Sequence, residues 1–563
     1  MANIFDSVLI QKPRRSMLNL SHDVKLTLDM GYLVPVLCRE VLPGDRWKVN
    51  VNAFVKMLPL MAPVMQRFDL KLEAWNVPNR LVFTQWPEFI TGGEDGEAEI
   101  AAPKISLNGV NCITNKRFTN GSLADYLGYP TIDPQADIND FFSENDSLVI
   151  DRLAFSGYQL IYNENYRDPN LTDEVDILSD FDGVFYDFEA PDKALAITQL
   201  RKRCWRKDYF TSALPFVQRG SDVLLPVGNQ FSSVGFKDDE FGTYIRAVGE
   251  SNLPLNPTSN VGGLLYSKFD NQSAVLTGSS MTSDPNQGGT KRPIQLDNSR
   301  SLYVDTRNTT ASINDLRLAY AVQRWKERNA VGGARYKEQL LAHFGRTVND
   351  ARLQRPEFLG ASTSPIIIGE ISQTSQTTED SVLGGFAGNA AGVNNGYLFD
   401  RTFDEHGYVF VLMSVIPRAS YSQGMPRQFT RNDRYDYAWP VYAHLGEQPV
   451  YVQEIMFNFP AKPYTRENDE VFGYQSRYAE YKFIAPSIHG AMKDSLDYWH
   501  AGRIFSDSPY LNSSFVTCNA TNRIFAVDNL DIEDVPTSYQ HHLLSQVVFD
   551  IRAIRPLPKY ELR

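Results

Sequence analysis

Alternation of apolar and polar residues is the clearest pattern in the chain, and its period is that of a β-strand. In "WKVNVNAFV" (47–55), in "FDLKLEAW" (68–75) and in "QVVFDI" (546–551), every second residue is apolar. Successive side chains of a strand point to opposite faces, so these segments predict strands with one buried face. The segment "YVFVLMSVI" (408–416) is continuously apolar, which predicts a strand covered on both faces.

Further strand signals follow towards the C-terminus, and the helical signals are fewer. The segments 449–459 ("PVYVQEIMFNF") and 477–484 ("RYAEYKFI") are rich in β-forming residues and lie between Pro, Gly and Asn clusters. Helices are predicted from Ser312 to a stop at Gly332-Gly333, over "RYKEQLLAHFG" ending at Gly345, and over 147–168 ending before Pro169. These helices are expected beside a sheet and not in a bundle.

Composition supports a mainly β chain. The 36 Gly and 31 Pro of the 563 residues suit many short strands joined by turns, and 42% hydrophobic with 12% aromatic residues suffice for a large core. Length alone allows several domains or one β domain with long insertions. The segment 221–300 is rich in Gly, Ser, Asn and Pro, which predicts a surface projection or a small excursion with its own turns.

The charge distribution limits any contact with nucleic acid to local sites, because the net charge is −12. Basic residues gather at both ends of the chain, where they could lie against a phosphate backbone without reading sequence: Arg14, Arg15, Arg552, Arg555, Lys559 and Arg563. Ordinary solvated tail charge is the alternative. A third basic cluster, "RKRCWRKDYF" (201–210), could bind phosphate or form ion pairs with a neighbouring subunit.

Signatures of catalysis, metals and cofactors are absent from the sequence. It contains no GxSxG, HExxH or GxxxxGK motif, its four Cys form no CxxC pair, and its eight His are dispersed. The acidic stretch 176–193 lacks the spacing of an EF-hand. No signal peptide and no apolar stretch of membrane-spanning length is present. We therefore expect a protein that is not an enzyme, with no metal, no cofactor and no membrane contact.

Six long blocks of the sequence form a recognisable set: "NVPNRLVFTQWPEFITGG", "YQLIYNENYRDPNL", "LRKRCWRKDYFTSALPFVQRG", "GGARYKEQLLAHFGRTVNDARLQRPEFLGAS", "RYDYAWPVYAHLGEQPV" and "VFGYQSRYAEYKF". Together they resemble the major capsid proteins of the Microviridae, and their gokushovirus-like branch in particular. They run in family order across nearly the whole chain. Only 221–300 matches nothing residue by residue.

The resemblance implies an eight-stranded antiparallel jelly roll with long inter-strand loops, in a single domain spanning 1–563 with extended termini at 1–20 and 552–563. It implies a small icosahedral (T=1) virion shell around a circular single-stranded DNA genome, made and assembled in the cytoplasm of a bacterial host. The implied partners are further copies of the chain, a small basic DNA-binding protein, a scaffolding protein, a minor pilot protein and a host receptor. By position, 221–300 is expected to form a threefold projection that meets the host.

A shell subunit explains an aromatic loop such as 76–93, since loops that contact neighbouring copies gain from Trp and Phe. The residues expected at subunit contacts are Trp75, Phe83, Trp86, Phe89, Arg203, Trp205, Tyr209 and Phe210. Two other classes stay open on sequence grounds. A carbohydrate-binding β protein would share the aromatic content, and a hydrolase on a β-sandwich would need a convergent set of catalytic side chains.

Overall fold

The structure is a computed structural model, and it divides into two compact units. Unit 1 comprises Met1–Arg219 and Glu327–Arg563, and unit 2 comprises Gly220–Lys326. Between 224 and 304 the structure describes only the backbone of short strands. The other described residues are 14–94, 97–108, 117–131, 147–186, 190–221, 223, 313–333, 335–372, 386–460, 465–526 and 541–559.

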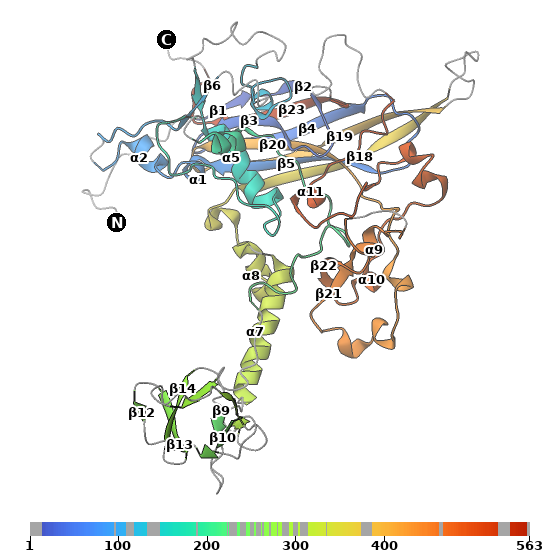
Figure 1. The fold of residues 1–563 in the computed structure, drawn as a ribbon. Coiled ribbons are helices and arrows are strands. Elements are labelled where there is room, and N and C mark those ends of the chain that lie inside the picture. The colour runs from blue at the N-terminus through green and yellow to red at the C-terminus, as the bar shows by residue number, and fades with distance from the viewer. Residues whose placement is uncertain are drawn as a thin grey trace. The chain divides into compact units, whose positions relative to one another are not determined.

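Unit 1 is built on a large curled antiparallel sheet (Figure 1). Its order is β1-β23-β4-β19-β18-β5-β20-β3, and β2 also pairs with β23. The sheet has two halves. The first half is β1/β2-β23-β4-β19 and the second is β18-β5-β20-β3, and this strand order is consistent with a jelly roll. The strands are β1 Ser16–Asn19, β2 His22–Leu28, β3 Val34–Val41, β4 Arg46–Met57, β5 Phe68–Pro78, β18 Glu357–Ser372, β19 Phe386–Thr402, β20 Gly407–Pro417 and β23 Leu543–Arg555. The prediction of a mainly β fold with few short helices is confirmed.

The two halves of the sheet share one hydrophobic core. Trp47 and Val51 of β4 and Phe549 of β23 belong to the same buried cluster as Leu70 of β5 and Val411 of β20. The polar residues that alternate with them along β4 and β23 point to the other, outward face. The strands predicted over 47–55, 68–75 and 546–551 are therefore present, with the buried faces that their alternation indicated.

The β5-β20 half is covered on its outward face as well. Every residue of β20 is buried, and Phe410 and Leu412 join a second cluster with Phe155 and Tyr158 of α5 (Leu153–Ile161). The Tyr158 hydroxyl donates to the carbonyl of Leu33, the residue directly before β3, at 2.9 Å, and this bond ties α5 to the start of that strand. The prediction that 408–416 is covered on both faces is confirmed. Also in this layer are α1 Asn79–Val82, α2 Trp86–Thr91, α4 Leu123–Leu127, α6 Pro191–Thr198, and the small sheet of β6 Lys104–Asn108, β7 Ser147–Asp151 and β8 Val184–Tyr186.

The charges on the outward face of β5 are mostly partnered. Glu73 forms an ion pair with Arg203 at 2.6 Å and accepts a hydrogen bond from the Tyr166 hydroxyl at 2.6 Å. Asp69 pairs with Arg67 at 2.8 Å. Burial alone would raise the pKa of Glu73, but the charge and hydrogen bonds of Arg203 and Tyr166 outweigh it, so the pKa lies below its usual value.

Three predicted segments differ from the structure. The predicted helix 147–168 begins with β7, because 147–151 finds hydrogen-bonding partners in β6, and only then continues as α5 and a π-helical turn, η2 Tyr162–Tyr166. The predicted strand 449–459 is only β21 Glu447–Tyr451, followed by α9 Val452–Ile455. The predicted strand 477–484 contains α10 Ala479–Lys482, and the partner of β21 is β22 Val471–Ser476. Short apolar runs do not distinguish strand from helix, and here tertiary contacts decide.

The helices predicted before and after Gly332 are confirmed as α7 Ile313–Gly332 and α8 Tyr336–Phe344. Gly345 ends α8 in the left-handed conformation, with φ +63°. Short 3₁₀ helices lie at η3 Asp350–Leu353, η4 Arg427–Phe429, η5 Arg434–Asp436, η6 Pro440–Tyr442, η7 Gly490–Lys493 and η8 Asp497–Trp499, and a last α-helix is α11 Ser513–Val516. Among the helices that the structure describes, none combines the length and hydropathy needed to cross a membrane.

Unit 2 contains sheets of its own. Seven strands form one antiparallel sheet in the order β11-β10-β16-β15-β14-β13-β12, and β9 pairs with β17. The unit also contains the first part of α7. Its strands are β9 Val234–Phe236, β10 Tyr244–Ala247, β11 Leu253–Pro254, β12 Asn260–Val261, β13 Leu264–Phe269, β14 Gln272–Thr277, β15 Ser280–Ser283, β16 Arg292–Leu296 and β17 Leu302–Val304.

We predict that Glu73→Gln lowers the free energy of unfolding by about 3 kcal/mol, because it leaves the Arg203 guanidinium, on a side chain only 16% exposed, without its counter-charge. The control Glu405→Gln removes the more exposed partner of Arg80 and should cost less than about 1 kcal/mol.

Since the pKa of folded Glu73 is lowered, its charge stabilises the fold at neutral pH, and this stabilisation is lost as the pH falls through that pKa. Denaturant unfolding at pH 7 and pH 3 measures both effects, and equal costs for the two variants at pH 7 would refute the role of the pair.

Candidate subunit-contact surfaces

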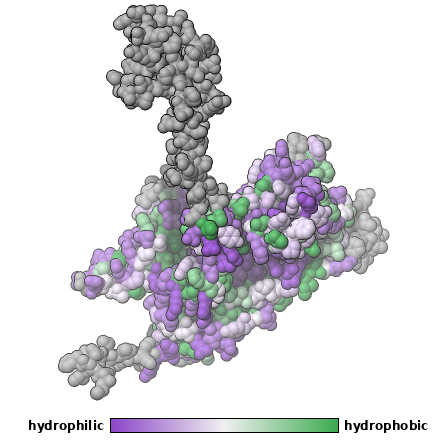
Figure 2. All heavy atoms as spheres, turned by 90° about the horizontal axis from the view of Figure 1, so that it is seen from below, coloured by the Kyte–Doolittle hydropathy of each residue, from purple (hydrophilic) through white to green (hydrophobic). Residues whose placement is uncertain are grey.

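A cluster of exposed aromatic and aliphatic side chains lies on the lobe of unit 1 formed by residues 427–445 and 478–484. Val441 is 83% exposed and Ile484 is 90% exposed. Figure 2 shows hydrophobic residues (green) interspersed among hydrophilic ones (purple) on the face that carries this lobe. We call the following residues the aromatic surface: Phe429, Tyr435, Tyr437, Trp439, Val441, Leu445, Tyr481, Phe483 and Ile484.

Polar contacts within the lobe hold this surface in place. The Arg431 guanidinium lies over the rings of Tyr437 and Tyr481, at 4.9 and 4.7 Å from their centroids. The Trp439 indole donates to the Arg434 carbonyl at 2.9 Å. Stacked and bonded rings lose little further freedom when a partner covers them, so the surface is prepared for binding at low entropic cost.

The composition of the aromatic surface is that of a protein contact. Interface cores are enriched in Tyr, Trp, Phe and Arg, and large exposed apolar patches on soluble proteins usually mark interaction sites. The Tyr and Trp rings of the surface are polar at one end and apolar at the other, so they are tolerated in water until a partner covers them. The aromatic surface is therefore the first candidate for contact between copies of the chain.

The second candidate is a basic cleft of about 850 Å³ on the outward face of β5. Its lining contains eight basic side chains and three acidic ones. The basic residues are Arg67, Lys71, Arg167, Arg203, Arg206, Lys207, Arg335 and Arg418, and the acidic ones are Asp69, Asp168 and Glu338. In a chain of net charge −12, this local excess of positive charge is an exception that predicts an anionic partner.

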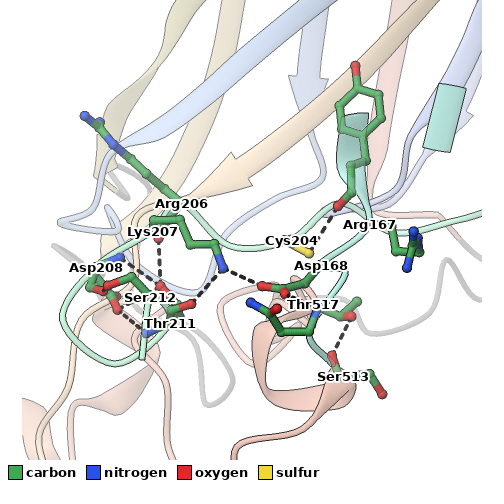
Figure 3. Close-up of polar contacts among 12 residues, drawn as sticks. Arg167, Asp168, Cys204, Arg206, Lys207, Asp208, Thr211, Ser212, Ser513 and Thr517 are labelled. Atoms are coloured by element: carbon green, nitrogen blue, oxygen red, sulfur yellow. Dashed lines mark hydrogen bonds and ion pairs between the residues drawn. The ribbon is translucent and has the colours of Figure 1, made fainter. Parts of the chain in front are cut away.

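Most cations of the cleft are partnered within the chain, and two are not. Lys207 donates to Asp168 at 2.6 Å and to the Thr211 carbonyl at 3.0 Å, as Figure 3 shows. The guanidinium of Arg206 makes no contact with the other residues drawn there. Among the described residues, neither Arg206 nor Lys71 has a side-chain hydrogen bond or ion pair. Burial, together with the charges of Arg203 and Arg206, lowers the pKa of Lys71, while Glu73 and Asp69 act in the opposite direction.

The third candidate is the surface around the chain ends. β1 pairs with the end of β23, with Asn19 opposite Arg552, and this pairing brings the N-terminal and C-terminal basic residues together. Arg14, Arg15 and Arg552 are exposed. Lys48 of β4 lies opposite Arg552 and is exposed too, so it extends the basic group that the sequence indicated.

Comparison with known proteins identifies the family. The family model described as capsid protein (F protein) matches residues 7–562. The chain is 32% identical to capsid protein VP1 of Chlamydia phage 1, over 100% of this chain and 97% of that protein. It is 32% identical to capsid protein VP1 of Bdellovibrio phage phiMH2K and 29% identical to that of Spiroplasma virus 4, in both cases over 97% of this chain and 94% of the relative.

This chain belongs to the capsid protein (F protein) family. The resemblance to Microviridae capsid proteins drawn from the sequence is thereby confirmed. A capsid protein of a phage has a structural role, is part of a virion and assembles with other subunits into a shell.

The residues that the sequence indicated for subunit contacts lie mostly inside one chain. Trp75, Phe83, Trp205, Tyr209 and Phe210 are buried, and Phe83 is fully enclosed. The stretch 76–93, expected to be a loop, forms the end of β5 and the helices α1 and α2, whose aromatic residues pack against the sheet. The half-buried Trp86 and Phe89 lie next to each other there, with ring centroids 5.6 Å apart.

Arg203 is also engaged within the chain, through Glu73 and the Ser414 hydroxyl. A role of these eight residues in contacts between copies stays a prediction. The aromatic surface was not singled out from the sequence, although "RYDYAWPVY" carries its signal: aromatic residues that follow neither a helical nor a strand period.

The basic residues expected to bind DNA fall into two groups. Arg555 contacts the buried carboxylate of Asp45 at 3.0 Å and donates to the Glu40 carbonyl at 2.8 Å, so its guanidinium already has partners. Arg14, Arg15, Arg552 and Lys559 lie at the surface. Arg563 lies outside the described residues. The DNA-binding role of the whole group stays a prediction.

We predict that Val441→Asp with Ile484→Asp blocks particle formation and leaves the fold intact. Both side chains are largely exposed, so the isolated chain should lose less than about 1 kcal/mol of stability, whereas each new carboxylate would have to be desolvated in a contact between copies. Sedimentation velocity reports assembly, and thermal melting reports folding. A matched control is Leu318→Asp, a substitution of an exposed apolar residue in unit 2. Parent-like particle yield from the double variant would exclude the aromatic surface as a contact.

Proposed function

We propose that this capsid protein builds a closed icosahedral shell, with one copy in each asymmetric unit, around a circular single-stranded DNA genome. The observation that supports it best is the aromatic surface, which a single chain holds in place and leaves uncovered. Identical copies can cover such a surface, and symmetry closes the assembly. The rival functions, sugar binding and hydrolysis on a β-sandwich, are less well supported, since the whole chain matches a capsid family.

The exposed basic residues near the chain ends are proposed to face the genome. Arg14, Arg15, Lys48 and Arg552 share one region because β1, β23 and β4 are neighbours. Lysine and arginine side chains neutralise phosphates without reading sequence, which suits a coat that must accept any segment of a genome. A small basic DNA-binding protein would share this task, and a scaffolding protein and a minor pilot protein would assist assembly and delivery.

Unit 2 is proposed to be the projection that meets the host receptor. It has its own sheets and forms a compact unit inserted between Arg219 and Glu327. An insertion that folds by itself can vary without disturbing the sheet of unit 1, which is what a receptor-binding element requires. We also propose that the chain is made, and the particles are assembled, in the cytoplasm of a bacterial host.

We predict that Arg14→Glu, Arg15→Glu and Arg552→Glu together leave shells forming but at least halve the DNA they retain, because three cations facing the phosphates become anions. Arg555 is left in place, since its pair with Asp45 stabilises the fold. The control Arg346→Glu reverses another exposed arginine, whose side chain has no hydrogen bond or ion pair among the described residues. The ratio of absorbance at 260 and 280 nm in purified particles measures DNA content, and an unchanged ratio in the triple variant contradicts the proposal.

We predict that replacing 221–300 by a short Gly-Ser linker spares unit 1 and abolishes attachment to host cells. The main sheet of unit 1 and its two largest hydrophobic clusters lie outside the deleted segment, so the melting temperature of the protein should change little. Particle counts and adsorption to host cells give the two readouts. An insoluble product would show that the segment is needed for the core, and full adsorption would show that attachment lies elsewhere.

A further inference from the structure

The basic cleft contains two cations, Lys71 and Arg206, whose side chains form no ion pair or hydrogen bond with the other described residues. Lys71 is half-buried, and its position on β5 places it between Asp69 and Glu73 along the outward face. Those two carboxylates are already paired with Arg67 and Arg203. Arg206 is exposed and repels Lys71. Like charges brought together at a half-buried position cost free energy, and a bound anion would remove that cost.

The same chain presents acidic side chains that lack a cation. Glu94, Glu97 and Glu99 follow α2, are exposed, and have no hydrogen bond or ion pair from their carboxylates among the described residues. They lie near one end of β5, since β5 ends at Pro78 and α1 and α2 follow directly (Figure 1). Lys71 lies near the other end. Seven residues of strand at about 3.3 Å each separate Lys71 from Pro78 by roughly 23 Å, so a chain is poorly placed to fill its own cleft.

We propose that the basic cleft receives the Glu94, Glu97 and Glu99 carboxylates of a second copy of this chain, in a head-to-tail contact. Such a contact joins two different surfaces of the same chain, and it closes into a ring when the rotation between copies divides a full turn. This inference rests on the proposed shell, and it assigns one contact in it to named residues.

We call Glu94, Glu97 and Glu99 the acidic segment. Nucleic acid is the other polyanion that could occupy the cleft, and two observations favour the acidic segment over nucleic acid. The aromatic residues that line the cleft, Tyr166 and Trp205, are buried, so they offer no exposed ring on which a base could stack. Lys71 also lies on the outward face of β5, whereas Arg552 lies on the outward face of β23, and their strands enclose the shared core. A genome that contacts Arg552 therefore lies on the side of the sheets away from the cleft.

A charge-swap experiment tests the contact. The cleft variant is Lys71→Gln with Arg206→Glu, the acidic-segment variant is Glu97→Lys with Glu99→Lys, and the third protein carries all four substitutions. Each double variant should lower the particle yield at least about tenfold, because a desolvated ion pair becomes a repulsion, and the fourfold variant should recover to within about threefold of the parent. The control Asp173→Lys with Asp180→Lys reverses two other exposed carboxylates and should assemble like the parent.

The readouts separate this contact from the proposed shell and from nucleic-acid binding. Sedimentation velocity gives particle yield, and thermal melting identifies any variant that fails to fold. If the cleft variant does not fold, Arg206→Glu takes the place of the cleft pair, both by itself and in combination with the Glu97→Lys and Glu99→Lys substitutions. The Arg206 side chain is exposed, so this single substitution should not disturb folding. If the fourfold variant yields no more particles than the weaker double variant, the proposed contact is wrong. In that case, particle formation by the parent protein still supports the shell. If the cleft variant gives a normal particle yield but its particles contain less DNA, the contact between copies is wrong and the cleft binds nucleic acid instead.

Discussion

The alternation of side chains along β4, β5 and β23 is the constraint on which the other features of this capsid protein depend. Each strand buries every second residue in one core shared by the two halves of the sheet, so the intervening residues must point outward on opposite sides. A shift of one residue in any of these strands would exchange its two faces. The alternation therefore decides that Arg552 and Lys71 lie on different sides.

The two outward faces are completed differently. On the β5 side, helices and loops cover the sheet, and the charged residues of that face are tolerated because partners such as Arg203 and Arg67 neutralise them. On the β23 and β4 side, polar and basic residues remain exposed. The lobe around β21 and β22 adds the aromatic surface, which internal stacking orders and no part of the described chain covers. A subunit of this kind leaves contact area for its neighbours and keeps its own core closed.

Sequence reasoning predicted the strands of the main sheet well, because period-two alternation in segments such as 47–55 reflects a single buried face. It also predicted α7 and α8, whose boundaries are marked by Ser312 and by the glycines at 332 and 345. It was wrong about 477–484, a short apolar run whose conformation tertiary contacts decide. The burial of Phe83 and Trp205 was not foreseen for a related reason: aromatic content does not tell whether a ring is covered by its own chain or by a neighbouring one.

The central claim is that copies of the chain cover what one chain leaves exposed, and cryo-electron microscopy of the assembled particle at side-chain resolution tests it most directly. The account predicts that Trp439, Val441 and Ile484 are buried against a neighbouring copy. A particle in which these side chains remain exposed to solvent, with the contacts between copies formed elsewhere, would contradict it.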